Sequence, residues 1–171
     1  MKPIMPCDTN LENSVLGALI QFPEVYPQIR DYITTDDVFY QKKAKLLWNK
    51  LKSMRNKKEY IDLTTVASSL KDEEIAEGLT HVYVVDCTMA AGLSGSTSAY
   101  VKKLYEKYLM RRVVEETSRI QISAMNSGEE AYDCIVTAHT LFSELIELNP
   151  TREKETIDSL LIDAVKDIQN K

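Results

Sequence analysis

Apolar residues recur every three or four positions along most of the chain, which is the period of amphipathic α-helices. The clearest case lies near the N-terminus, where one stripe of a predicted helix consists of Leu11, Val15, Leu16, Leu19 and Ile20. Thr9 and Glu12 have the spacing of a capping box, which predicts where this helix begins. Gly17 lies within the stripe and costs about 1 kcal/mol relative to alanine. We expect the close approach of a second helix to offset this cost.

Shorter helices are predicted in the next fifty residues. Pro23 and Pro27 restrict where one of these helices can begin, because proline is tolerated in a helix only in its first turn. Thr35 is placed to cap a short turn, and Asp62 to cap a helix that follows it. The helix between these two caps has an apolar face formed by Ala44, Leu47, Trp48, Leu51 and Met54.

The segment 79–99 gives conflicting signals. The residues at 82–85 favour a strand by propensity, whereas Gly92 and Gly95 with neighbouring serines favour a loop. Since no second strand is available to pair with the first, we predict a short helix followed by a connection.

A long helix is predicted from Ser98 to about Asn126, and a return helix follows it. Ser127 and Gly128 form the turn between the two. Their apolar positions alternate in steps of three and four, the pattern of a coiled-coil seam. The predicted seam residues are Met110, Val113, Thr117, Ile120 and Ala124 in the first helix, and Ala131, Ile135, Ala138, Phe142 and Leu145 in the second. The two helices are therefore predicted to form an antiparallel hairpin.

A final amphipathic helix is predicted beyond Pro150, with an apolar stripe that nothing else in the sequence covers. The fold class is therefore all-α, with a globular helical head at 1–99, a helical hairpin at 100–148 and a linker with a docking helix at 149–171. The stripe of the docking helix consists of Ile157, Leu160, Leu161, Ala164, Val165 and Ile168.

Composition excludes several classes of protein. The net charge of −5 does not favour phosphate backbones, whose binding depends on lysine and arginine. No uninterrupted apolar run is long enough to span a membrane, and the first ten residues do not form a secretory signal. The three cysteines are widely spaced, which suggests reduced thiols in a cytoplasmic protein.

No motif points to catalysis. The chain lacks a P-loop, and His81 and His139 have no metal-ligand spacing to another histidine or cysteine. We therefore expect no catalytic, cofactor-binding or metal-ligating residue in this chain.

Two clusters leave alternatives open. The segment 41–58 contains eight basic residues and no acidic one. It is either a face for nucleic acid or an acidic partner, or, as we favour, the solvated side of the helix that contains Trp48. Tyr100, Tyr105 and Tyr108 either anchor an interface or pack within the chain.

Several segments together resemble the N-terminal domain and linker of the DnaB-family replicative helicases. These are the first helix at 10–20, the Phe39-Tyr40 pair, the Ile61–Ala67 segment, and Tyr100 followed by Leu109, Arg111, Arg112 and Val113. The amphipathic tail at 156–168 stands where that family has a linker helix. Gln41-Lys42 replaces the usual histidine after the Phe-Tyr pair, and 79–98 matches the family poorly.

This resemblance implies a six-helix head, a hairpin and a linker helix in a non-catalytic domain. The family's heads form the collar of a hexameric ring, which receives primase and in some cases a helicase loader. An ATP- and magnesium-dependent motor would follow Lys171, so the chain is expected to be a fragment of a helicase that unwinds DNA. The resemblance implies an oligomer interface on the hairpin, at Tyr105, Tyr108, Leu109, Arg112, Ile120 and Phe142. Ile157, Leu160, Leu161, Val165 and Ile168 would dock on a neighbouring subunit.

Two alternatives remain at this stage. The helicase-binding C-terminal domain of a primase resembles the same fold, although such a domain would usually end with its hairpin. A small helical helicase loader or DNA-binding adaptor could use the basic segment 41–58, against which the acidic net charge counts.

Overall fold

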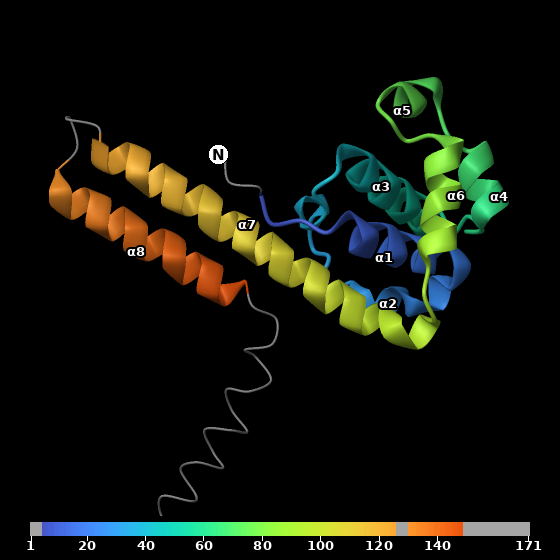
Figure 1. Cartoon of the computed structure of the whole chain (residues 1–171), viewed down its shortest axis with the longest axis horizontal. Helices are drawn as coiled ribbons and strands as arrows, with labels where there is room; N and C mark the ends of the chain where they lie inside the picture. The colour runs from blue at the N-terminus through green and yellow to red at the C-terminus, as the bar shows by residue number, and fades with distance from the viewer. Residues whose placement is uncertain (1–4, 126–129, 149–171) are drawn as a thin grey trace, which may run out of the picture. The chain divides into compact units, whose positions relative to one another are not determined.

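The computed structural model describes residues 5–125 and 130–148, and every regular element in these residues is helical. The chain divides into two compact units, Met1–Arg111 and Arg112–Lys171. We call them the head and the C-terminal unit (Figure 1). The absence of strands in the described residues confirms the predicted all-α class.

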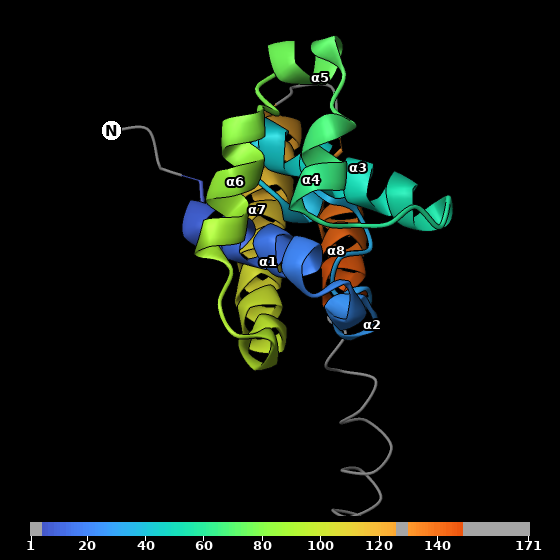
Figure 2. The ribbon, with the colours of Figure 1, turned by 90° about the vertical axis from the view of Figure 1, so that its right-hand side faces the viewer.

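The head contains six α-helices before the long helix α7 begins. They are α1 (Thr9–Gln21), α2 (Tyr26–Ile29), α3 (Lys42–Asn56), α4 (Leu63–Ser68), α5 (Asp72–Ala76) and α6 (His81–Ala90). Three 3-10 turns accompany them: η1 (Pro23–Val25), η2 (Asp36–Val38) and η3 (Ser94–Ser96). α1 is central, since it contacts α3, α4 and α6 (Figure 2).

Side-chain caps set where several of these helices begin. Thr35 accepts a hydrogen bond from the Asp37 amide, and Asp62 forms a reciprocal capping box with Thr65, so both predicted caps are confirmed. The predicted capping box of α1 is wrong. Its cap is Asp8, whose carboxylate accepts from the amides of Asn10 and Leu11.

Glu12 has a different structural role from the one predicted. Its carboxylate is fully buried and accepts hydrogen bonds from the backbone amides of Tyr40 (2.7 Å) and Gln41 (3.2 Å). The Gln41 side chain donates a third bond at 3.2 Å. Glu12 therefore anchors the segment that enters α3, because its carboxylate accepts charge-assisted hydrogen bonds from two consecutive backbone amides of that segment.

The head core combines the apolar faces of α1, α3 and α6 with the start of α7. The predicted face of α3 is confirmed, since Ala44, Leu47, Trp48, Leu51 and Met54 are all buried. Gly17 meets α6 so closely that the expected approach of a second helix is also confirmed. The short helix predicted in 79–99 is confirmed as α6, whereas the connection after it contains η3 and leads into α7 at Thr97.

α7 (Thr97–Met125) begins within the head. Val101, Leu104, Tyr105 and Tyr108 on this helix are buried in the head core. The compact head therefore extends to Arg111, beyond the position 99 expected from the sequence, because the first turns of α7 supply part of its hydrophobic core.

The C-terminal unit contains the second half of α7 and α8 (Ala131–Glu147). α8 runs in the direction opposite to the second half of α7 (Figure 1). The predicted turn at Ser127 and Gly128 and the predicted docking helix at 156–168 lie outside the described residues. The antiparallel pairing of individual side chains in the hairpin stays a prediction.

Candidate protein interface

α8 exposes apolar side chains along one of its sides. We call this surface the α8 face; it consists of Tyr132, Ile135, Val136, Phe142 and Ile146. Steps of three, four and seven residues place these positions on one side of a helix. A second set with helical spacing is partly buried: Cys134, Ala138, Leu141 and Leu145. α8 is therefore apolar on two sides, and among the described residues only one of these sides is even partly covered.

The exposed side of α8 includes residues that the sequence assigned to the seam. Ile135 is 65% exposed and Phe142 is 40% exposed. Cys134 and Leu141, one position earlier in each case, are less exposed. A helix that is apolar on two sides contains two overlapping three-and-four patterns, so spacing alone does not reveal which one faces inward.

The other predicted interface residues fall into two groups. Tyr105 and Tyr108 are only 5% and 7% exposed and lie in the head core, so for these two rings packing within the chain is the interpretation that fits. Their ring centroids are 5.6 Å apart, and Tyr105 also meets the edge of Tyr32 at 6.0 Å. Leu109, Arg112 and Ile120 are partly buried.

A charged cluster lies on α7 at the start of the C-terminal unit. Glu116 is fully buried, and its carboxylate accepts hydrogen bonds from Arg112 at 2.6 Å and from Arg119 at 3.1 Å. Arg112 also pairs with Glu115 at 3.6 Å. Arg112 and Arg119 each lie about one helical turn from Glu116, so the cluster fixes the Arg112 side chain along the helix. The Arg112 side chain predicted for the interface is thus held by its own helix.

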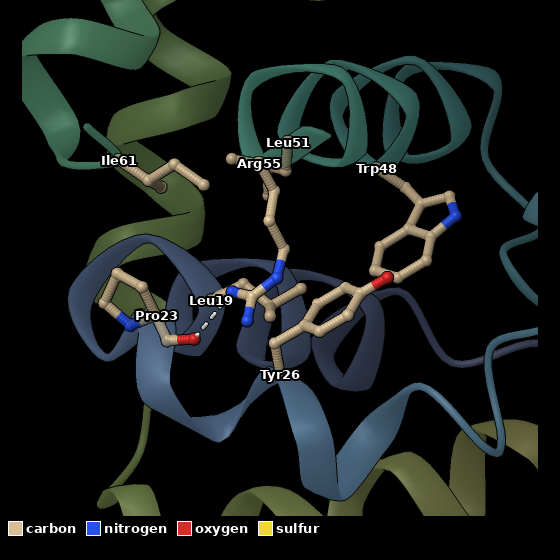
Figure 3. A pocket seen from close by; sticks show the side chains of 7 residues that line it. All are labelled: Leu19, Pro23, Tyr26, Trp48, Leu51, Arg55 and Ile61. Atoms are coloured by element: carbon tan, nitrogen blue, oxygen red, sulfur yellow. Dashed lines mark hydrogen bonds between the residues drawn. The ribbon is translucent and has the colours of Figure 1, made fainter. Parts of the chain in front are cut away.

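A small cavity in the head is lined by an arginine (Figure 3). The Arg55 guanidinium lies 4.1 Å from the centre of the Tyr26 ring and donates to the Pro23 carbonyl at 3.2 Å. Tyr26 in turn stacks on Trp48 with ring centroids 6.0 Å apart. The remaining space is about 10 Å³, which at most one water molecule would fill. This cavity is therefore part of the packed core and offers no room for a ligand.

Most of the basic segment 41–58 has partners within the head. Lys42, Lys45 and Lys50 pair with Glu77, Asp37 and Glu74 respectively. The Lys43 ammonium lies 4.2 Å from the centre of the Tyr83 ring, and Arg55 occupies the cavity described above. Within the described residues, this leaves few of the eight basic side chains for a nucleic acid and favours the solvated-face interpretation.

Residue types that ligate metals do not gather in the part of the chain that the structure describes. None of the described histidines, cysteines, aspartates and glutamates form a group of three or more that could hold a metal ion. His81 and His139 are both exposed. Among the helices described, none is both long and apolar enough to cross a membrane.

Comparison with known proteins points to replicative helicases. The family model "DnaB-like helicase N terminal domain" matches residues 4–106. The replicative DNA helicase DnaC of Bacillus subtilis (strain 168) is 22% identical over 165 residues, which cover 96% of this chain and 36% of the relative. The N-terminal domain of DnaB helicase from Mycobacterium tuberculosis has a TM-score of 0.73 at 19% identity, covering 82% of this chain and 99% of that one.

A further solved structure is that of a DnaB-like replicative helicase, described together with its interactions with primase. It has a TM-score of 0.64 at 17% identity and covers 96% of this chain but only 35% of that one. The chain thus spans about a third of the length of its Bacillus subtilis relative. Because the family model matches more than half of the chain, the chain belongs to the DnaB-like helicase N-terminal domain family.

Proposed function

We propose that this chain is the non-catalytic assembly domain at the N-terminus of a replicative DNA helicase. The family match and the Bacillus subtilis relative support this role. The domain self-associates through the α8 face and helps to build the collar of a hexameric ring in the cytoplasm.

The α8 face is the observation that carries this proposal. A helix that is apolar on two sides normally lies inside a bundle, where both sides are covered. Within the described residues, α8 has one side covered only in part and the other exposed. A second copy presents the same face, so two copies related by a two-fold axis cover each other's apolar surface. Aromatic residues such as Tyr132 and Phe142 are typical anchors of such contacts.

The proposed assembly has further partners. Primase binds the assembled domains, as suggested by the similar helicase whose structure was described with its primase interactions. A helicase loader is a further partner in the same replication machinery. The domain meets DNA only as part of the ring, which agrees with its net charge of −5.

The motor and the linker complete the proposal. ATP and magnesium bind to a motor domain in the parent protein, not to this chain. The predicted docking helix, with Ile157, Leu160, Leu161, Val165 and Ile168, attaches to the motor of an adjacent subunit. The apolar stripe of that segment is the sequence feature that supports this role.

Sedimentation velocity of the 171-residue chain at tens of micromolar tests self-association. We expect a concentration-dependent oligomer for the wild type. Phe142→Asp should weaken self-association by about tenfold or more, because it places a charge in the apolar contact. Val85→Asp, an exposed position on α6, is the matched control and should sediment like the wild type. A wild-type chain that stays monomeric throughout would refute the proposal.

A second experiment addresses the docking helix in the parent helicase. Leu161→Asp should leave the thermal transition of the head unchanged and abolish ring assembly. Loss of the head transition in this variant would instead show that the segment folds back onto the head.

A further inference from the structure

α6 carries an exposed apolar surface on the head. Val82, Val85 and Met89 form this α6 stripe and are 68%, 39% and 81% exposed, and Leu93, which follows the end of α6 at Ala90, is 81% exposed. The opposite side of α6 packs on α1 through Tyr83, Val84 and Cys87, which are buried. α6 therefore already buries one apolar side in the core, and the α6 stripe is a second apolar side that faces away from it.

The stripe lies in a strongly acidic part of the chain. Between Lys71 and Lys102 there are five acidic residues and no lysine or arginine. Glu74 and Glu77 pair with Lys50 and Lys42 of α3. Asp86, which helical spacing places between Val82 and Met89, is exposed, and no ion pair joins it to any residue that the structure describes. An uncompensated negative charge thus lies within the apolar stripe.

The charge pattern distinguishes between possible occupants of the stripe. A second copy related by a two-fold axis would bring the acidic stripe against itself, so that Asp86 would face like charge. The chain's own segment 151–171 has an apolar stripe, but between 157 and 168 three acidic residues, Asp158, Asp163 and Asp167, outnumber the one basic residue, Lys166. Both occupants would add negative charge to an acidic surface, whereas a basic partner would neutralise it.

We infer that the α6 stripe is a docking surface for a basic amphipathic helix of a partner protein. Such a helix lays apolar residues spaced by three, four and seven along Val82, Val85 and Met89. Its flanking lysines or arginines lie beside Asp86. From Val82 to Met89 the stripe is about 10 Å long at 1.5 Å per residue, so a partner helix of about two turns covers it. This surface is distinct from the α8 face, and the inference does not depend on self-association.

Binding of synthetic helical peptides to the full chain tests this inference. One peptide has leucines at helical spacing flanked by lysines, and a second has the same leucines flanked by glutamates. Methyl-labelled methionines report the location, because Met89 lies on α6 while the exposed Met110 and Met125 lie on α7. We expect the basic peptide to shift the Met89 signal alone and its affinity to fall as salt is added. We expect the acidic peptide to bind at least tenfold more weakly.

A matched pair of valines provides the variants. Val85 on α6 and Val114 on α7 are 39% and 37% exposed, so neither is needed for the core. Val85→Lys should weaken binding of the basic peptide by about tenfold or more, and Val114→Lys should leave it unchanged. Asp86→Asn should weaken binding and reduce its salt dependence. Unchanged thermal transitions establish that each variant is folded.

Several outcomes would overturn the inference. Equal binding of the two peptides would show a surface that is merely apolar, and shifts at Met110 or Met125 in place of Met89 would move the binding to α7. If the basic peptide does not bind, the α6 stripe is not a docking surface for a basic helix. A Met89 signal that changes with protein concentration would assign the stripe to a second copy, and one that changes in Leu161→Asp would assign it to the chain's own segment.

Discussion

The backbone of Gly17 in α1 lies directly against the backbone carbonyl of Cys87 in α6. A Cβ atom at position 17 would stand 1.8 Å from the Cys87 oxygen and 2.5 Å from its carbonyl carbon. Both obstacles are backbone atoms of a helix, so a rotamer change cannot relieve the clash. Glycine at this position therefore sets how closely the two central helices of the head can pack.

Gly17→Ala should destabilise the head, although alanine is the better helix former by about 1 kcal/mol. We expect a net loss of about 1–3 kcal/mol in the free energy of unfolding, because α1 and α6 must move apart. Urea denaturation followed by circular dichroism measures this loss. Gly95→Ala is the control, since a Cβ there meets no atom within 4 Å. A stabilised Gly17→Ala variant would contradict the close packing described above.

Glu12→Gln tests the buried carboxylate at the entry to α3. The substitution replaces one acceptor oxygen with an NH2 group, which then faces the amide donors of Tyr40 and Gln41. We expect a loss of about 1–3 kcal/mol in unfolding free energy. Glu24→Gln, at an exposed glutamate, should change stability by less than about 0.5 kcal/mol. If the two substitutions change the free energy of unfolding equally, Glu12 does not anchor the entry to α3.

Lys58 offers a stabilising change. Its φ of 57° lies in the left-handed region, where glycine avoids the strain that a side chain causes. Lys58→Gly should therefore raise the unfolding free energy by about 0.5–1 kcal/mol. Its neighbour Lys57 has a φ of −81°, so Lys57→Gly should lower stability by a similar amount. Thermal denaturation of both variants distinguishes this backbone effect from the loss of a positive charge.

Cys87 should be the least reactive thiol of the three. Burial raises the pKa of the Cys87 thiol to about 12, whereas Cys7 and Cys134 are partly exposed. Alkylation at pH 8 followed by mass spectrometry should label Cys7 and Cys134 first and Cys87 only on unfolding. Labelling of all three at similar rates in the native protein would show that α6 is not held against α1.

The same thiol predicts a pH dependence of stability. A thiol with a raised folded-state pKa keeps its proton in the folded protein at pH values where the unfolded chain has lost it. Its contribution to stability is therefore complete below the unfolded pKa of about 8.5 and falls as the pH rises toward 12. The stability difference between wild type and Cys87→Ala should shrink over this range, as measured by urea denaturation at each pH.

The local pattern of the chain was sufficient for most of the secondary structure. The face of α3, the caps at Thr35 and Asp62, and α7 to within one residue at each end could all be predicted, because these features depend on neighbours within one or two turns. The cap of α1 was misassigned because Asp8 and Thr9 are adjacent and both are good caps. The hydrogen bonds from the Asn10 and Leu11 amides to Asp8 show which of them serves, and Glu12 instead faces donors 28 and 29 residues away.

Sequence by itself thus determined the all-helical class, the order of the helices and the family. Tertiary structure alone decided which sides of those helices are covered. Tyr105 and Tyr108 belong to the head core, whereas Ile135, Phe142 and the α6 stripe are exposed. The physical reason is that a helical period identifies an apolar side but not its neighbour. Burial depends on contacts between residues far apart in the chain, so the candidate interfaces became visible only in the folded molecule.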